Sequence, residues 1–268
     1  MPNLILKRIN DIISQISDKN YREYIGLLFK YGSTPRNQKR IITFYKYKIE
    51  VPDFLSFIFQ YKDIFVKNIY KFNSGNNSPL IYDCGANIGI SCLYFKELFP
   101  SARIKAFEAD PAIANILSNN LRANKISGID ITAKAVWTDN NGIDFNSDGA
   151  DGGSITQSPG GIRVDSVSLR NLLLNEEKID LIKMDIEGAE VDVIIDCNET
   201  LKIADKIFIE FHSWMNNRKR LDLLLKTLHD NGFSYFIESI SNLSSPLLGS
   251  NITGSNLQLN IFATNNNL

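Results

Sequence analysis

The sequence has 268 residues, of which 44% are hydrophobic and 22% are charged, a balance typical of a globular protein long enough to bury a full core. Its formal net charge of −1 excludes a global electrostatic attraction to nucleic acid or to an anionic membrane. The three cysteines, Cys84, Cys92 and Cys197, lack metal-site spacing, so we expect buried free thiols. A charged N-terminal stretch and the lack of a long apolar run predict a cytoplasmic protein without a membrane span.

Residues 1–75 are predicted to form an N-terminal α+β extension, separate from a main domain over residues 76–268. Apolar residues recur at helical spacing at the start of the chain, residues 40–51 are rich in strand formers, and Asp53 is placed to cap a second helix. The extension is expected to be a lid or flank packed on the main domain. The alternative is that it forms part of the substrate pocket or a homodimer contact. Its few basic residues are typical of a solvated face, so we reject nucleic-acid binding.

A glycine-containing turn opens the main domain. An apolar run ends in Asp83, and the segment GANIG at residues 85–89 then leads into a helix. Such a strand, turn and helix place free backbone N–H groups and the positive end of a helix dipole at one point, which suits a nucleoside-type cofactor. Gly85 and Gly89 let the backbone bend and a ligand approach, and Asn87 tolerates a left-handed conformation.

The order of residues in this turn argues against a dinucleotide. The dinucleotide fingerprint is G-x-G-x-x-G, whereas the order here is D-x-G-x-N-x-G. A carboxylate at Asp83 would repel a pyrophosphate and would hold an ammonium group, directly or through water. The turn therefore favours a zwitterionic cofactor that bears an amino acid, such as S-adenosylmethionine. Taken alone, it is equally compatible with an ordinary connection between a strand and a helix.

Strands and helices alternate through the rest of the main domain. The predicted strands that follow are residues 103–107, 129–136, 179–184, 206–211, 233–240 and 257–263. Helical patterns separate the earlier strands, which implies a parallel sheet, whereas no helical pattern separates the last two, which should pair antiparallel. The Gly/Ser-rich segment 149–161 is predicted to be a loop that closes over the substrate or a surface hairpin.

Polar or ionisable residues stand where four of these strands end. They are Asp83, Glu108, Asp185 and the pair Glu210 and His212. Because ligands bind beyond the carboxyl ends of the strands in an open parallel sheet, we expect these side chains to share one pocket. Glu108 follows the second strand, where an acidic residue accepts hydrogen bonds from both ribose hydroxyls. Its alternative role is that of a carboxylate favoured by a helix dipole.

The combination of IYDCGANIG, AFEADP, KAVW, IDLIKMDIEGAE and IFIEFH resembles the FkbM-type S-adenosylmethionine-dependent methyltransferases. The resemblance covers roughly residues 80–215, with IKMDIEGAE as its most specific part, and extends more weakly to LQLNIFA near the C-terminus. It implies an α/β, Rossmann-like class I methyltransferase sheet that is mostly parallel with an antiparallel last strand. It also implies methyl transfer to a hydroxyl of a sugar, glycan or glycosylated metabolite, and hence a carbohydrate or glycoconjugate acceptor.

The resemblance further implies roles for individual residues. The implied cofactor-binding residues are Asp83, Gly85, Ala86, Asn87, Gly89, Glu108, Ala109, Ala135, Val136 and Asp185. The glycine turn would line the methionine half of the cofactor, Glu108 would bind the ribose, and the backbone of Ala135 and Val136 would flank the adenine. Asp185 would lie near the methyl group.

Methyl transfer to an alcohol requires an aligned hydroxyl and a proton acceptor, because the cofactor supplies the activated methyl group. The candidate catalytic residues are His212, Asp185 and Glu187. We prefer His212 as the base, since a histidine titrates near neutral pH. The alternative is that His212 is only hydrogen-bonded at the strand end and has no catalytic role. Asp185 could be the base, could orient His212, or could bind a cation.

The charged residues around the predicted fourth strand could hold a metal ion, but a site without a metal is favoured. Some sugar and catechol O-methyltransferases hold Mg²⁺ through strand-end carboxylates, for which Asp185, Glu187 and Glu210 are available here. The tandem acidic pair of those enzymes is replaced by Phe-His, so we expect no metal. Lys183 lies on the same strand face as Asp185 and is expected to pair with Glu210 or Glu187.

Two other classes of function are open at this stage. A nicotinamide-dependent oxidoreductase would need the G-x-G-x-x-G turn, which the sequence lacks. A non-catalytic binding module that keeps the cofactor fold would share every motif described above. Titration with S-adenosylhomocysteine and with NAD distinguishes an oxidoreductase from a methyltransferase. Measurable turnover distinguishes a methyltransferase from a non-catalytic binding module.

Overall fold

The computed structural model describes residues 16–146, 154–155, 162–213, 218–240 and 257–267. The helix expected at the very start of the chain and most of the predicted loop at residues 149–161 lie outside these segments. All three cysteines are free and buried, as predicted. No helix in the described segments is both long and apolar enough to cross a membrane.

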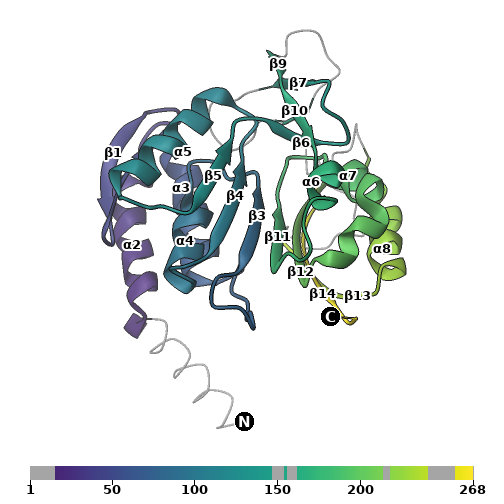
Figure 1. The fold of residues 1–268 in the computed structure, drawn as a ribbon. Coiled ribbons are helices and arrows are strands. Elements are labelled where there is room, and N and C mark those ends of the chain that lie inside the picture. The colour runs from purple at the N-terminus through teal and green to yellow at the C-terminus, as the bar shows by residue number, and fades with distance from the viewer. Residues whose placement is uncertain (1–15, 147–153, 156–161, 214–217, 241–256, 268) are drawn as a thin grey trace, which may run out of the picture.

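A seven-stranded sheet with the order β13–β14–β12–β11–β3–β4–β5 lies at the centre of the molecule (Figure 1). Its strands in chain order are β3 (Leu80–Cys84), β4 (Arg103–Phe107), β5 (Ile129–Thr132), β11 (Leu181–Met184), β12 (Lys206–Ser213), β13 (Phe233–Ser239) and β14 (Leu257–Asn265). Strand β14 is antiparallel to β12 and β13, and the other neighbouring pairs are parallel. The predicted α/β fold with a mostly parallel sheet and an antiparallel last strand is therefore confirmed.

Helices cover both faces of the sheet (Figure 1). In the main domain they are α4 (Ile90–Leu98), α5 (Pro111–Ala123), α6 (Leu169–Leu173), α7 (Glu190–Cys197), the 3₁₀ helix η2 (Asn198–Ile203) and α8 (Leu221–Asp230). One apolar cluster joins α4 and α5 to the sheet, and a second joins α6, α7 and α8 to the opposite face. Helix α5 begins where the sequence predicts, because Asp110 accepts the N–H groups of Ala112 and Ile113 and Pro111 follows it directly.

The N-terminal extension packs on the face that carries α4 and α5. It contains α2 (Lys19–Tyr31), the antiparallel hairpin of β1 (Arg40–Phe44) and β2 (Tyr47–Val51), α3 (Phe54–Tyr61) and the π-helical turn η1 (Lys62–Val66). Asp53 caps α3 as predicted. The Asn120 amide on α5 accepts the N–H of Glu50 at 2.7 Å and donates to its carbonyl at 3.1 Å. Buried residues on both sides of the predicted boundary after residue 75 belong to one apolar cluster.

The strand predicted at residues 129–136 is in fact two strands. Strand β5 ends at Thr132, where the N–H of Lys134 bonds to the Thr132 carbonyl and turns the chain out of the main sheet. The next strand, β6 (Ala135–Trp137), pairs in parallel with β10 (Ser166–Ser168). A separate antiparallel sheet contains β7 (Ile143–Asn146), β8 (Ser154–Ile155) and β9 (Ile162–Val164). The turn between β5 and β6 carries no glycine or proline, so its local pattern gave no sign of the break.

We expect Phe44→Ala to lower the free energy of unfolding by about 3–5 kcal/mol, the usual cost of truncating a buried phenylalanine. Phe44 is 1% exposed, and its ring lies 5.3 Å from that of Phe57 and 5.6 Å from that of Tyr61. Urea unfolding followed by circular dichroism and by tryptophan fluorescence measures the change. Phe29→Ala is the matched control, because Phe29 is 86% exposed. Equal stability of the two variants would contradict the packing of the extension described above.

Candidate active site

The site lies along the carboxyl edge of four neighbouring parallel strands, β12, β11, β3 and β4. The register aligns Met184 of β11 with Cys84 of β3 and with Ile209 of β12. The residues that follow these positions, Gly85, Asp185 and Glu210, therefore stand side by side. Glu108 follows β4, whose last residue pairs with Cys84. The structure thus brings together the strand-end residues that the sequence singled out.

The turn after β3 needs its two glycines for different reasons. Gly85 has φ of +83°, and a Cβ there would lie 1.8 Å from the Asp185 carbonyl oxygen. Gly89 has φ of +94°, and a Cβ there would lie 2.6 Å from a methyl group of Leu117 on α5. Asn87 is left-handed with φ of 47°, as predicted. The first glycine therefore lets β3 and β11 approach at their ends, and the second lets α5 pack against the turn.

Asp83 is fully buried beneath this turn and is paired within the protein. Its Oδ2 accepts a hydrogen bond from the Ser91 hydroxyl at 2.5 Å, and its Oδ1 lies 3.4 Å from Lys183 Nζ. The Lys183 ammonium also lies 3.5 Å from Asp185 Oδ2 and donates to the Gly85 carbonyl at 2.5 Å. The partners of Lys183 are therefore Asp83 and Asp185, and the expectation of Glu210 or Glu187 was wrong. The reason is register, because Lys183 pairs with Asp83 across β11 and β3.

Glu108 binds the glycine turn from the neighbouring strand. Its carboxylate accepts the N–H of Asn87 and that of Asp110, each at 2.9 Å. Burial raises the pKa of Glu108 to about 7, although both of these hydrogen bonds lower it. Ala135 is buried in a small apolar cluster against which Ala109 packs. The residues expected around the ribose and the adenine thus lie on adjoining segments.

His212 is enclosed by carboxylates. It is 1% exposed, with Nδ1 at 3.2 Å from Glu190 Oε1 and Nε2 at 3.5 Å from Glu210 Oε1 and 3.7 Å from Glu187 Oε2. Burial lowers the pKa of His212, but the hydrogen bonds to Glu190 and Glu210 outweigh it and raise the pKa to about 12. These contacts favour the imidazolium form of the ring, whereas the base near neutral pH that the sequence predicts would have to be a neutral ring.

Asp185 and Glu187 reach the open edge of the site, and His212 does not. The Asp185 and Glu187 side chains are 25% and 26% exposed, against 1% for the ring. Burial raises the pKa of Glu187 above its usual range, and the charge of His212 opposes that shift. Glu187 has a left-handed φ of 55°, which is unusual for a residue with a side chain. The backbone thus directs this carboxylate to the edge at a cost in strain.

Glu190 is the residue that sequence reasoning missed. It opens α7 and is fully buried, with its Oε1 within 3.2 Å of the His212 ring. The spacing E-G-A-E after an apolar strand was visible in the sequence, but a glutamate in the first turn of a helix is also an ordinary dipole partner. Only the enclosure of His212 separates the two roles.

Within the described segments, Asp185, Glu187 and His212 form the group whose ligand atoms could hold a metal ion, since these atoms lie within 4.8 Å of one another. Glu210, the third oxygen of the Mg²⁺ set considered from the sequence, instead lies against the histidine ring. The imidazolium supplies, from within the chain, the positive charge that clustered carboxylates require.

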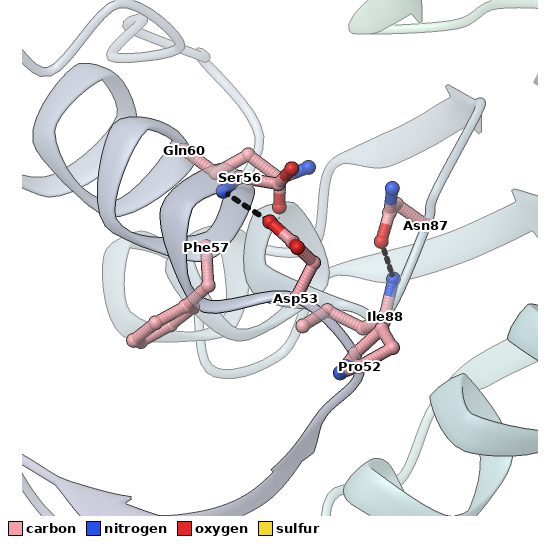
Figure 2. A pocket seen from close by; sticks show the side chains of 7 residues that line it. All are labelled: Pro52, Asp53, Ser56, Phe57, Gln60, Asn87 and Ile88. Carbon is pink, nitrogen blue, oxygen red and sulfur yellow. Dashed lines mark hydrogen bonds between the residues drawn. The ribbon is translucent and has the colours of Figure 1, made fainter. Parts of the chain in front are cut away.

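Helix α3 of the extension lies against the glycine turn. Between them is a cavity with a water-accessible volume of about 10 Å³ (Figure 2), lined by Pro52, Asp53, Ser56, Phe57, Gln60, Asn87 and Ile88. The Asp53 carboxylate accepts the N–H of Ser56 at 3.0 Å and the Nε–H of Arg36 at 2.6 Å. The extension is therefore in contact with the residues that carry the cofactor motif.

A mostly parallel sheet with an antiparallel last strand and a glycine turn after β3 defines a class I methyltransferase fold. A family model described as the methyltransferase FkbM domain matches residues 83–235, more than half of the chain. The chain therefore belongs to the FkbM family of S-adenosylmethionine-dependent methyltransferases, and the resemblance seen in the sequence is confirmed.

Two relatives that are similar in sequence agree with this assignment. The chain is 28% identical over 214 residues to methyltransferase sdnD of Sordaria araneosa, which covers 65% of this chain and 81% of that protein. It is 32% identical over 155 residues to 2-O-methyltransferase NoeI of Sinorhizobium fredii, which covers 50% of this chain and 63% of that protein. Methyltransferase FkbM from Methylobacillus flagellatus is a similar solved structure, with 17% identity, a TM-score of 0.47, and coverage of 78% of this chain and 53% of that one.

Gly85→Ala should destabilise the protein by more than about 1 kcal/mol, because φ is positive and the new Cβ would overlap the Asp185 carbonyl. The same variant should lose affinity for S-adenosylhomocysteine, since β3 and β11 would have to separate at the site. Urea unfolding and calorimetric titration measure the two effects. The control is Gly75→Ala, where a Cβ meets nothing within 4 Å. A Gly85→Ala protein indistinguishable from this control would refute the close approach of the two strands.

Glu108 should make stability depend on pH. Its pKa is about 7 in the folded protein against an ordinary value of 4.5, so the folded state binds more protons between these pH values. The free energy of unfolding should therefore fall as pH rises from 4.5 to 7. Urea unfolding across this range should show a smaller fall for Glu108→Gln than for the wild type. Glu199→Gln, at an exposed helical position, should keep the wild-type slope; equal slopes in all three proteins would contradict the burial argument.

Proposed function

We propose that this protein transfers a methyl group from S-adenosylmethionine to a hydroxyl of a sugar, glycan or glycosylated metabolite. The observation that carries the proposal is the placement of two partly exposed carboxylates, Asp185 and Glu187, one strand away from the glycine turn and beside a buried imidazolium. A methyl donor on the turn would put its reactive carbon at this edge. The relative NoeI is a 2-O-methyltransferase, which supports oxygen as the acceptor atom.

The cofactor is proposed to lie across the ends of β3 and β4. The turn from Gly85 to Gly89 would hold its methionine half, the Glu108 carboxylate its ribose hydroxyls, and the segments around Ala109 and Ala135 its adenine. Helix α3 lies against this turn, which supports a role for the extension as a wall of the cofactor site. Its alternative role in a homodimer contact stays a prediction.

The charge of the site favours a cationic cofactor. Two cations, the His212 imidazolium and the Lys183 ammonium, are surrounded by the carboxylates of Asp185, Glu187, Glu190 and Glu210. Asp83 is the second carboxylate partner of Lys183, beside Asp185. Carboxylates outnumber cations, and the site is largely screened from water. A sulfonium would reduce this imbalance, whereas the pyrophosphate of a nicotinamide cofactor would add to it.

The transfer is an in-line displacement in which the bond from sulfur to the methyl carbon breaks as a bond from the acceptor oxygen to that carbon forms. The hydroxyl proton must leave to a group that reaches the acceptor. We assign that role to Glu187, because it is partly exposed at the edge of the site and lies 3.7 Å from the His212 ring, whose positive charge lowers the pKa of this carboxyl. His212 would favour the ionised form of Glu187 from behind, and Asp185 would align the acceptor.

Calorimetric titration with S-adenosylhomocysteine, followed by mass spectrometry of sugars and sugar nucleotides incubated with S-adenosylmethionine, tests the proposal. We expect tight binding and a product heavier by one methyl group on oxygen. Absence of S-adenosylhomocysteine binding would defeat the cofactor assignment, and binding without any methylated product would favour a non-catalytic module. A product methylated on nitrogen or carbon would overturn the assignment of the acceptor atom.

Glu187→Gln should lower kcat by about 10²–10⁴-fold, the usual contribution of a general base, while S-adenosylhomocysteine binding is kept. Asp185→Asn should raise KM for the acceptor more than it lowers kcat. The control is Glu177→Gln, which removes an exposed glutamate outside the site. Full turnover by Glu187→Gln would remove Glu187 from the mechanism, whatever the acceptor is.

A further inference from the structure

A single buried oxygen joins the two halves of the acceptor site. Oε1 of Glu190 lies 3.2 Å from His212 Nδ1, and it also accepts the backbone N–H of Ile186 at 3.2 Å and that of Gly188 at 3.0 Å. Glu190 is 0% exposed, so water does not compete for these bonds. The loop after β11 and the histidine on β12 are thus fixed by the same atom.

The first consequence concerns the Glu187 turn. The two N–H groups that bond to Glu190 belong to the residues on either side of Glu187. Glu187 and Gly188 both have positive φ, of 55° and 97°, and a left-handed conformation costs a residue with a side chain of order 1–3 kcal/mol. Glu190 therefore holds Glu187 in a conformation that it would otherwise leave, with its carboxylate at the edge of the site.

The second consequence concerns the histidine ring. Because the Glu190 carboxylate can only accept hydrogen bonds, Nδ1–H donates to it, and Nε2 is left to face Glu187 and Glu210. A carboxylate behind a histidine orients the ring and stabilises its charged form in many hydrolases, where its loss leaves the ring in the wrong state. Here the same arrangement places Nε2 between Glu210, at 3.5 Å, and Glu187, at 3.7 Å, the carboxylate to which we assign the acceptor proton.

A purely structural role fits Glu190 poorly. Its second oxygen, Oε2, is buried and has no hydrogen-bond partner among the described residues. A buried carboxylate with an unsatisfied oxygen is costly, and a neutral side chain could accept the same two backbone N–H groups. The feature that only a negative charge provides is the pairing with His212.

We propose that Glu190 is a positioning residue for methyl transfer, which fixes His212 Nε2 toward Glu187 and holds the Glu187 turn at the acceptor. The inference rests on the proposed function only in that Glu187 takes the acceptor proton. The geometry that it predicts for the ring is independent of the acceptor and is measurable without turnover.

Nitrogen-15 NMR of the histidine side chains tests that geometry. The protein has two histidines, His212 and His229, so a His229→Gln variant assigns the spectrum. We expect the wild type at neutral pH to show both His212 nitrogens protonated, with a slowly exchanging Nδ1 proton that is lost or shifted in Glu190→Gln. An unprotonated Nδ1 in the wild type would overturn the proposal by itself, even if Glu190→Gln failed to fold.

Steady-state kinetics test whether this positioning contributes to methyl transfer. Glu190→Gln should lower kcat by about 10²-fold, as expected when a reacting group is misplaced, while KM and S-adenosylhomocysteine affinity stay within about twofold. Asp192→Asn is the matched control, because it removes a half-exposed carboxylate from the same helix, where Asp192 pairs with Lys219. Unchanged kcat, or a fall in kcat with an unaltered His212 spectrum, would refute positioning. Failure of the wild type to bind S-adenosylhomocysteine would instead refute the proposed function. The geometry of the His212 ring would then still be tested by the NMR measurement.

Discussion

The site depends on one buried ammonium group. Lys183 is 2% exposed, and its Nζ lies between Asp83 and Asp185 while it donates to the Gly85 carbonyl. Removing one partner of a buried ion pair typically costs 3–5 kcal/mol, because the other charge is left without compensation. The glycine turn, which carries the cofactor motif, and the end of β11, where Asp185 lies, are thus bound to the same cation. Their relative position is fixed before any ligand arrives.

The two halves of the site use different chemistry because their tasks differ. Around Gly85 and Glu108, the chain offers backbone N–H groups, a helix N-terminus and one carboxylate, which suits recognition of a nucleoside and an amino acid. Around His212, carboxylates from three segments enclose a ring that they keep charged. A proton acceptor and a cationic methyl donor both gain from that surplus of negative charge. The N-terminal extension is coupled to the first half, since Asn120 bonds to both Glu50 and the Ile88 carbonyl.

Local pattern was sufficient to predict the sheet, the glycine turn, the left-handed Asn87 and the caps of α3 and α5, because each follows from a few neighbouring residues. It failed at residues 129–136, where a turn without glycine or proline divides a run of strand formers into β5 and β6. It also failed for Lys183, because the choice between carboxylates at similar distances along the chain is made by the register of β11 against β3. Pairing across strands is set by the whole sheet and leaves no mark in a single segment.

The state of His212 shows why catalytic roles are harder to predict than folds. From the sequence, a histidine at a strand end suggested a base near neutral pH, since its ordinary pKa lies there. The first of the contacts that raise its pKa comes from Glu190, which lies 22 residues away along the chain, and Glu210 on the same strand adds to it. If Glu187 accepts the acceptor proton, as proposed, the residue that positions the His212 ring matters as much as the ring itself, and that residue is Glu190.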